Sequence, residues 1–282
     1  MNKESLEKMN RMRLLGMHLA FKTCIDANQT EAFTNDELVH HLVQSEWDDR
    51  QHRAVQRNLK NANFRYNASL EQLDYSEERG LDKNQVQRLS TCDFIKKGED
   101  LFITGSTGTG KSFLASAIGQ QGCLLGLKVL YTNVAKLMSY LKMAKADGTH
   151  LKELTRIEKQ DALILDDFGV QPLDAQSRAL LLDIIEDRHG KRTTIITSQV
   201  PVKNWHEVIG EKTLADAILD RIVHQSIRIE LYGESLRKKL KPKSEKTETT
   251  LKTNRNINYH YFCSAKHEFF ITFLAFFLRP QS

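Results

Sequence analysis

The sequence predicts an α/β protein built on a parallel sheet of five strands with helices on both faces. Between residues 100 and 233, short apolar or β-branched runs alternate with longer helical patterns, which is typical of a parallel sheet. One of these runs leads directly into a glycine-rich loop and then a helical pattern. With 282 residues, 40% of them hydrophobic and 27% charged, the chain can bury a sizeable core.

A charged helical stretch precedes the predicted sheet. From residue 1 to about 89, apolar residues recur at spacings of three and four, in two patterns separated by a polar break at residues 28–30. This periodicity indicates amphipathic helices, so we expect a small all-helical N-terminal module. The five expected strands of the sheet that follows are residues 101–104, 129–132, 162–165, 194–197 and 227–231.

Composition and the chain ends predict a cytoplasmic protein without a membrane partner. The four cysteines form no C-x-x-C pair, which argues against a disulfide scaffold and a cysteine-rich zinc site. The first twelve residues are charged and lack the apolar centre of a secretory signal. The apolar run at residues 269–278 is about half of the ~20 residues that span a bilayer. Polar, Lys-, Thr- and Asn-rich sequence before it predicts a disordered or atypical tail over residues 241–282.

The glycine-rich loop is a candidate phosphate-binding site. It fits G-x-x-x-x-G-K-[ST] in full and lies between a predicted strand and a predicted helix. In such a loop successive backbone N–H groups point at the phosphates, and the helix N-terminus adds its positive end. Lys111 would reach the β- and γ-phosphates, and the Ser112 hydroxyl would ligate Mg²⁺. The residues expected to hold the nucleotide are Gly105, Ser106, Thr107, Gly108, Thr109, Gly110, Lys111 and Ser112.

Polar residues at the ends of two further strands complete the predicted catalytic set. Asp166 and Asp167 end the run 162–165; Asp166 would hold Mg²⁺ through water, and Asp167 would activate the attacking water as a general base. A helix cap or a solvated acid is the alternative for Asp167. Gln199 ends the fourth strand, where it could orient water against the γ-phosphate, with Ser198 as the second candidate for this sensor.

Five segments in this order resemble the IstB family, the ATP-binding helper proteins encoded beside the transposase in a class of bacterial insertion sequences. That family is close to the DnaC-type replicative helicase loaders of the AAA+ superfamily. The resemblance covers about residues 5–240 and implies a P-loop NTPase fold of the AAA+ type. The segments are the phosphate loop, Leu165–Gly169, Thr197–Val202, Ala215–Arg221 and Gly233–Lys238.

The resemblance also implies an ATPase that uses ATP and Mg²⁺, assembles as a homo-oligomer on double-stranded DNA and engages its transposase. Arg221 stands where such proteins offer an arginine finger to a neighbouring subunit's ATP. Arg237 stands where a sensor contacts the phosphates of its own subunit, and Arg188 competes with Arg221 for the finger. Surface ion pairing is the alternative for Arg221 and Arg237. The expected domains are residues 1–89, a DNA- or partner-binding module with its linker, and residues 90–240, the AAA+ ATPase domain.

A row of cations in the helical module is the candidate DNA contact. Arg50, Arg53, Arg57 and Lys60 are spaced three, four and three residues apart, which on a helix forms one basic stripe that can follow a phosphate backbone without reading bases. A solvated charged face is the alternative. The leading function is thus an ATP-dependent helper of transposition. A helicase loader, with the module gripping a helicase, and a small-molecule P-loop kinase are the alternatives.

Overall fold

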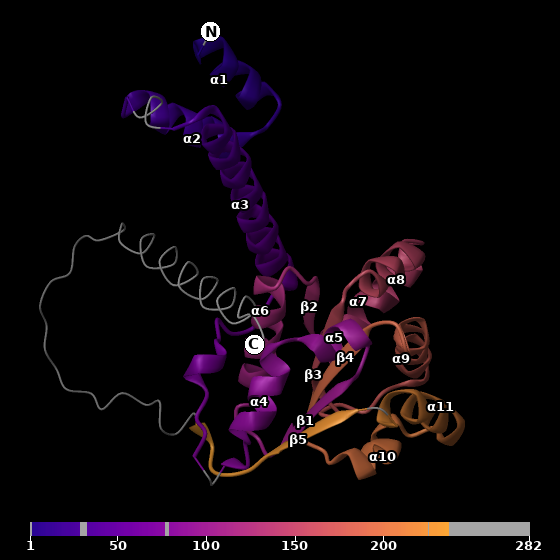
Figure 1. Ribbon diagram of the computed structural model, residues 1–282. Coiled ribbons are helices and arrows are strands. Elements are labelled where there is room, and N and C mark those ends of the chain that lie inside the picture. Colours follow the sequence, from indigo (N-terminus) through magenta and orange to yellow (C-terminus); the bar gives the residue numbers. More distant parts are fainter. Residues whose placement is uncertain (1, 29–32, 77–78, 225, 237–282) are drawn as a thin grey trace, which may run out of the picture. The chain divides into compact units, whose positions relative to one another are not determined.

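The computed structural model describes residues 2–28, 33–76, 79–224 and 226–236 (Figure 1). The chain divides into two units, Met1–Leu240 and Lys241–Ser282, and all described residues belong to the first. The predicted tail over residues 241–282 and the candidate sensor Arg237 lie outside the described residues.

The predicted five-stranded parallel sheet is confirmed. Its strand order is β2-β3-β4-β1-β5, and every neighbouring pair is parallel. The strand β4 therefore lies between β3, which contains the acid pair, and β1, which leads into the phosphate loop. The strands are β1 Leu101–Gly105, β2 Val129–Asn133, β3 Ala162–Phe168, β4 Thr193–Ser198 and β5 Ile227–Leu231.

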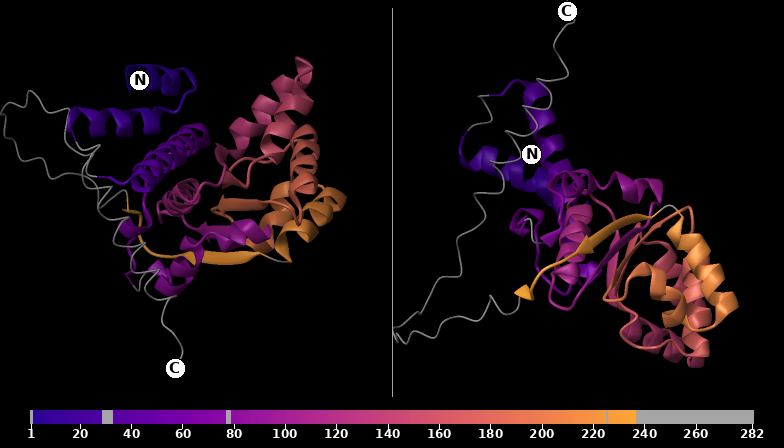
Figure 2. Two further views of the ribbon diagram at one scale, coloured as in Figure 1. Left: turned by 45° about the horizontal axis from the view of Figure 1, so that its top comes forward. Right: turned by 90° about the horizontal axis from the view of Figure 1, so that it is seen from below.

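Helices cover both faces of the sheet, so the central strands are apolar on both sides. Along β1, Phe102 packs into one core and its neighbours Leu101 and Ile103 into the other. One core contains residues of α7 Val134–Ala146, α8 His150–Glu158, α9 Ala175–Arg188, α10 Trp205–Ile209 and α11 Lys212–Val223. The other contains residues of α4 Lys83–Ser90, α5 Asp93–Lys97 and α6 Lys111–Leu124. Figure 2 shows the two helical layers on either side of the strands.

The N-terminal residues form helices, as expected: α1 Asn2–Arg11, α2 Leu15–Asp26 and α3 Asn35–Ala62. A capping box between Thr34 and Glu37 starts α3, and its 28 residues extend about 42 Å at 1.5 Å per residue. The buried carboxylate of Glu46 joins α3 to α2, because it accepts hydrogen bonds from the backbone N–H groups of Gly16 and Met17 (2.9 and 3.2 Å).

The C-terminal end of α3 is anchored to the core of the sheet domain. Ala62 is fully buried in the core that contains α6, and Leu59 packs against that core. The Asn58 amide donates to the carbonyls of Gly126 and Leu127 at 3.1 and 3.2 Å. A helix that begins beside α2 thus ends against the sheet domain (Figure 1).

The structure bears on the state of the cysteines and on membrane-spanning helices. The thiols of Cys24, Cys92 and Cys123 are free and buried, and burial raises the pKa of Cys92 to about 11. Within the described ranges, no helix has both the length and the apolar character that a membrane span requires.

Candidate nucleotide-binding site

The glycine-rich loop connects β1 to α6, as the sequence predicts. At two of its positions only glycine fits, because neighbouring atoms leave no room for a Cβ and because φ is positive. At Gly105 (φ 145°) a Cβ would lie 2.2 Å from the carbonyl oxygen of Leu231, and at Gly108 (φ 86°) it would lie 2.1 Å from Ser235 Oγ. The Leu236 N–H also donates to the Gly108 carbonyl at 3.0 Å. The segment after β5 therefore closes over the loop.

Lys111 and Ser112 begin α6 and point in different directions. Lys111 is buried, and its Nζ donates to the carbonyl of Ser106 at 2.7 Å, inside the loop. The Ser112 hydroxyl donates to Asp166 Oδ1 at 2.7 Å. The structure thus brings together the hydroxyl and the carboxylate that the sequence assigns to Mg²⁺.

Asp166 is a fully buried carboxylate surrounded by donors. Besides Ser112, the hydroxyls of Thr197 and Tyr131 donate to it. Burial and the hydrogen bond to Asp166 raise the pKa of Tyr131, so this phenol stays protonated and remains a donor. Asp166 is therefore held in one position by three hydroxyl donors.

Asp167 is turned toward the solvent side of the site by a backbone irregularity. The β3–β4 register shifts between Leu165 and Phe168, and Asp167 has a φ of 60°, which is uncommon for a residue with a side chain. Its N–H donates to the Thr197 hydroxyl at 3.1 Å, and the Asn133 amide donates to its Oδ2 at 3.1 Å. Its carboxylate is 30% exposed and lines the cavity described next.

A cavity of about 500 Å³ extends from the phosphate loop. Gln199 lines it and accepts a hydrogen bond from Thr107 Oγ1 at 2.6 Å. Ser198 does not, because its hydroxyl is buried and bonds the carbonyl of Phe168 and the N–H of Val200. The geometry favours Gln199 over Ser198 as the sensor. Away from the loop the cavity is lined by the polar residues Gln72, Asp74 and Arg79 and by a larger set of mainly apolar side chains: Tyr66, Leu73, Leu81, Phe113, Leu114, Leu231 and Leu236.

The family model described as IstB-like ATP binding protein matches residues 7–244 of the chain. The chain belongs to this family. It is 43% identical over 240 residues to an IstB-like relative from Sinorhizobium fredii (strain NBRC 101917 / NGR234), named as insertion sequence ATP-binding protein y4pL, with 85% of this chain and 98% of the relative covered. It is 28% identical over 236 residues to the IS21 ATP-binding protein of Pseudomonas aeruginosa, with 84% and 89% covered.

Among solved structures, this IstB-like chain is similar to the crystal structure of DnaI. The TM-score is 0.51 at 24% identity, over 64% of this chain and 92% of that one. At this identity the likeness concerns the fold alone, a five-stranded parallel sheet with helices on both faces.

Three residues of the IstB-like site were missed from the sequence. Asn133 holds Asp167, and since it ends β2, the strand-end rule that selected Gln199 would also have found it. Arg79 is buried and donates to the Thr109 carbonyl at 2.8 Å while pairing with Asp74 at 3.3 Å. Arg65 lies 3.4 Å from Asp166 Oδ2 and 3.3 Å from Asp167 Oδ2. Both arginines come from the connector between α3 and α4, which the sequence analysis included in the all-helical module. That expectation is wrong for this segment, because apart from the short helix Leu70–Gln72 its described residues are not helical.

The candidate finger role of Arg188 is wrong. This side chain is only 1% exposed, and its guanidinium donates to the carbonyls of Ile157 (2.9 Å), Gln160 (3.0 Å) and Thr193. Burial lowers the pKa of Arg188 to about 10, so it stays charged at neutral pH. A fully enclosed guanidinium ties α8 to β4 and cannot be offered to another subunit.

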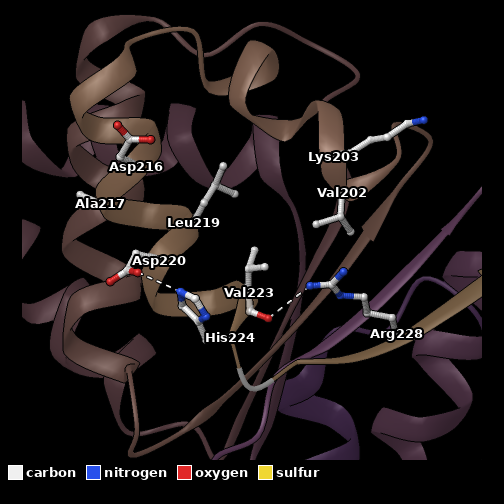
Figure 3. A pocket seen from close by; sticks show the side chains of 9 residues that line it. All are labelled: Val202, Lys203, Asp216, Ala217, Leu219, Asp220, Val223, His224 and Arg228. Carbon is white, nitrogen blue, oxygen red and sulfur yellow. Dashed lines mark hydrogen bonds and ion pairs between the residues drawn. The ribbon is translucent and has the colours of Figure 1, made fainter.

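Arg221 lies on α11, where its guanidinium bonds the Ala217 carbonyl (2.8 Å) and Glu186 (3.1 Å). The same helix lines an open groove of about 680 Å³ (Figure 3). Asp216 and Asp220 lie on one side of this groove, and Lys203 and Arg228 on the other. None of the residues that line it belongs to the phosphate loop, so the cavity beside β1 is the candidate nucleotide site rather than this groove.

The candidate DNA stripe lies on α3, as predicted. Arg50 pairs with Glu46 at 2.7 Å, and Arg53 pairs with Asp49 at 2.7 Å. Arg57 and Lys60 are exposed. Two of the four cations are therefore partly compensated by carboxylates of the same helix.

Proposed function

We propose that this chain binds ATP with Mg²⁺ and hydrolyses it. The observation that carries the proposal is the convergence of three strand ends on one cavity: the phosphate loop after β1, Asp167 of β3 and Gln199 after β4, with the buried Asp166 bonded to Ser112 of the loop. Lys111 would neutralise charge on the β- and γ-phosphates, Asp167 would deprotonate or orient the attacking water, and Gln199 would position that water. Arg237 would contact the phosphates of the same subunit.

The donor set fits Mg²⁺. This hard cation prefers oxygen ligands and usually keeps several waters, and the site offers the Ser112 hydroxyl with the Asp166 carboxylate 2.7 Å away. When bound, Mg²⁺ would supply positive charge that offsets the negative charge developing on the phosphate. Ser112 would ligate it directly and Asp166 through water.

The proposed role of the ATPase is that of an insertion-sequence helper that assembles on double-stranded DNA as a homo-oligomer and regulates the transposase of its element. Membership of the IstB-like family and the basic residues of α3 support this role. Arg221 would act on the ATP of a neighbouring subunit, which makes hydrolysis depend on assembly. The stripe would bind phosphates, so DNA affinity should fall steeply with salt.

The test is duplex DNA binding with ATP, with ADP and without nucleotide, across a salt series, with phosphate release followed in the same samples. We expect tight, salt-sensitive binding that requires ATP, and hydrolysis that DNA alters. Lys111→Ala should abolish the nucleotide dependence, whereas Lys145→Ala, which removes an exposed lysine of α7, should not. ATP binding without any affinity for duplex DNA at low salt would contradict the helper role and favour a helicase loader.

A further inference from the structure

Arg65 lies at the junction between the N-terminal helix and the acid pair. Helix α3 ends at Ala62, Asn63 caps it in the left-handed conformation (φ 56°), and Arg65 follows two residues later. Its guanidinium lies 3.4 Å from Asp166 Oδ2 and 3.3 Å from Asp167 Oδ2. One cation thus contacts both carboxylates that the proposed function assigns to Mg²⁺ and water.

The residues on either side of Arg65 fix its backbone against the nucleotide site. Phe64 packs edge-on to Tyr131, with ring centroids 6.3 Å apart, and its ring is so near Gly119 that a Cβ there would lie 2.6 Å away. The carbonyl of Tyr66 accepts a hydrogen bond from Gln120 at 2.7 Å. Arg65 therefore belongs to a short, well-packed connector, and a displacement of its side chain acts on that connector.

The Arg65 side chain itself is less constrained than its backbone. It is 44% exposed, and besides the two carboxylates it contacts the Tyr66 ring, with Cζ 5.5 Å from the centroid. Asp166, by contrast, is fixed by three hydroxyl donors. When a second cation approaches the carboxylates, Arg65 is therefore the partner that can move, because like charges repel at such distances.

We propose that Arg65 relays the state of the nucleotide site to α3, by competing with Mg²⁺ for Asp166 and Asp167. This relay rests on the proposed function. The Arg65 guanidinium leaves the two carboxylates when they hold Mg²⁺ with nucleotide, and the connector at residues 63–66 loosens. Since α3 carries the basic stripe, the same contact links nucleotide binding to the helix proposed to meet DNA.

The first experiment measures binding of a fluorescent ATP analogue as Mg²⁺ is titrated. Arg65→Ala removes the competing cation, so half-maximal binding should need about fivefold less Mg²⁺, as expected for loss of a partly exposed ion pair. Arg88→Ala is the matched control, because it removes an exposed arginine of α4 and should leave the midpoint unchanged. An unchanged midpoint in Arg65→Ala overturns the proposal. So does a raised one, which would make Arg65 a phosphate ligand.

The second experiment follows amide hydrogen exchange over residues 59–66. In the wild-type chain, Mg²⁺ with ATP should speed exchange there at least severalfold, whereas Arg65→Ala should exchange fast with or without nucleotide. An equal response to nucleotide in both chains overturns the relay even if the Mg²⁺ midpoint shifts. A wild-type chain that binds no nucleotide overturns the proposed function and the relay together. Normal wild-type binding with an unaltered Arg65→Ala variant overturns the relay alone.

Discussion

Replacing Arg188 or Arg221 by alanine should have opposite consequences for folding and for hydrolysis. Arg188 is enclosed between α8 and β4 and donates to three backbone carbonyls. Arg221 is partly exposed, with one carbonyl and one surface carboxylate as partners. We expect Arg188→Ala to lower the free energy of unfolding, and Arg221→Ala to leave it almost unchanged while hydrolysis in the assembly is lost.

The loss of stability in Arg188→Ala can be worked out from the buried carbonyls that would lose their hydrogen-bond donor. A buried acceptor that loses its donor costs about 1–3 kcal/mol. The Ile157 carbonyl keeps a second bond from the Gln160 N–H (3.1 Å), so the lower end of that range applies to it. Because three carbonyls lose a charged donor at once, we expect Arg188→Ala to lower the free energy of unfolding by about 3–5 kcal/mol. This is a large part of the ~5–15 kcal/mol that stabilises a domain. Arg221→Ala should cost less than about 1 kcal/mol.

The loss should also depend on pH, because Arg188 lies near Asp100. Burial raises the pKa of Asp100 to about 7, and the charge of Arg188 opposes that rise. A carboxyl whose folded pKa is raised stabilises the fold at low pH, and that stability is lost as the pH rises through the folded value. Without the charge of Arg188 the folded pKa of Asp100 rises further, so the decrease in stability continues above pH 7. The difference between Arg188→Ala and wild type should therefore be greater at pH 8 than at pH 5.

Equilibrium urea unfolding, followed by far-UV circular dichroism at pH 5 and pH 8, measures these differences. Phosphate release from the assembled protein with DNA gives the second readout for both variants. The reasoning is refuted if Arg188→Ala unfolds within about 1 kcal/mol of wild type. Loss of hydrolysis in a fully stable Arg188→Ala chain would restore the finger role that the structure denies it.

Three further predictions concern the loop and the N-terminal helices. Gly108→Ala should weaken nucleotide binding at least tenfold, since its Cβ would meet Ser235 Oγ at 2.1 Å; binding of a fluorescent nucleotide within threefold of wild type would contradict this. Arg79→Ala frees the Thr109 carbonyl and should weaken nucleotide binding severalfold with little change in far-UV dichroism, as calorimetry can test. Burial raises the pKa of Glu46, but hydrogen bonds from Arg50 and from the backbone of Met17 and Gly16 outweigh this effect and lower the pKa below its usual value. Its stabilisation of the α2–α3 contact should thus be present at pH 7 and lost as the pH falls below about 4.5. Glu46→Gln should remove this dependence, which amide exchange in α2 would report.

Local pattern was sufficient for the elements that carry their own signal. The five strands were predicted because both faces of a parallel sheet are buried, which leaves a short apolar run in the sequence for each strand. The phosphate loop was predicted because glycines at fixed spacing, a lysine and a serine form one contiguous segment. The acid pair and Gln199 followed from one rule, that parallel strands end at the same edge of the sheet.

Contacts between distant segments were decided only by the tertiary structure. Arg65 and Asp166 are 101 residues apart, and Arg79 reaches the phosphate loop across 30 residues; no local pattern marks either arginine. Arg188 and Arg221 each lie in the last turn of a helix and look equivalent in the sequence, yet one is enclosed by β4 and α8 and the other is partly exposed. Periodicity shows which face of a helix is apolar, but the burial of a charged side chain depends on the carbonyls that the rest of the fold brings to it. The sequence by itself therefore determined the sheet and the phosphate loop, and the fold decided which arginines lie at the loop and the acid pair and which one is enclosed in the core.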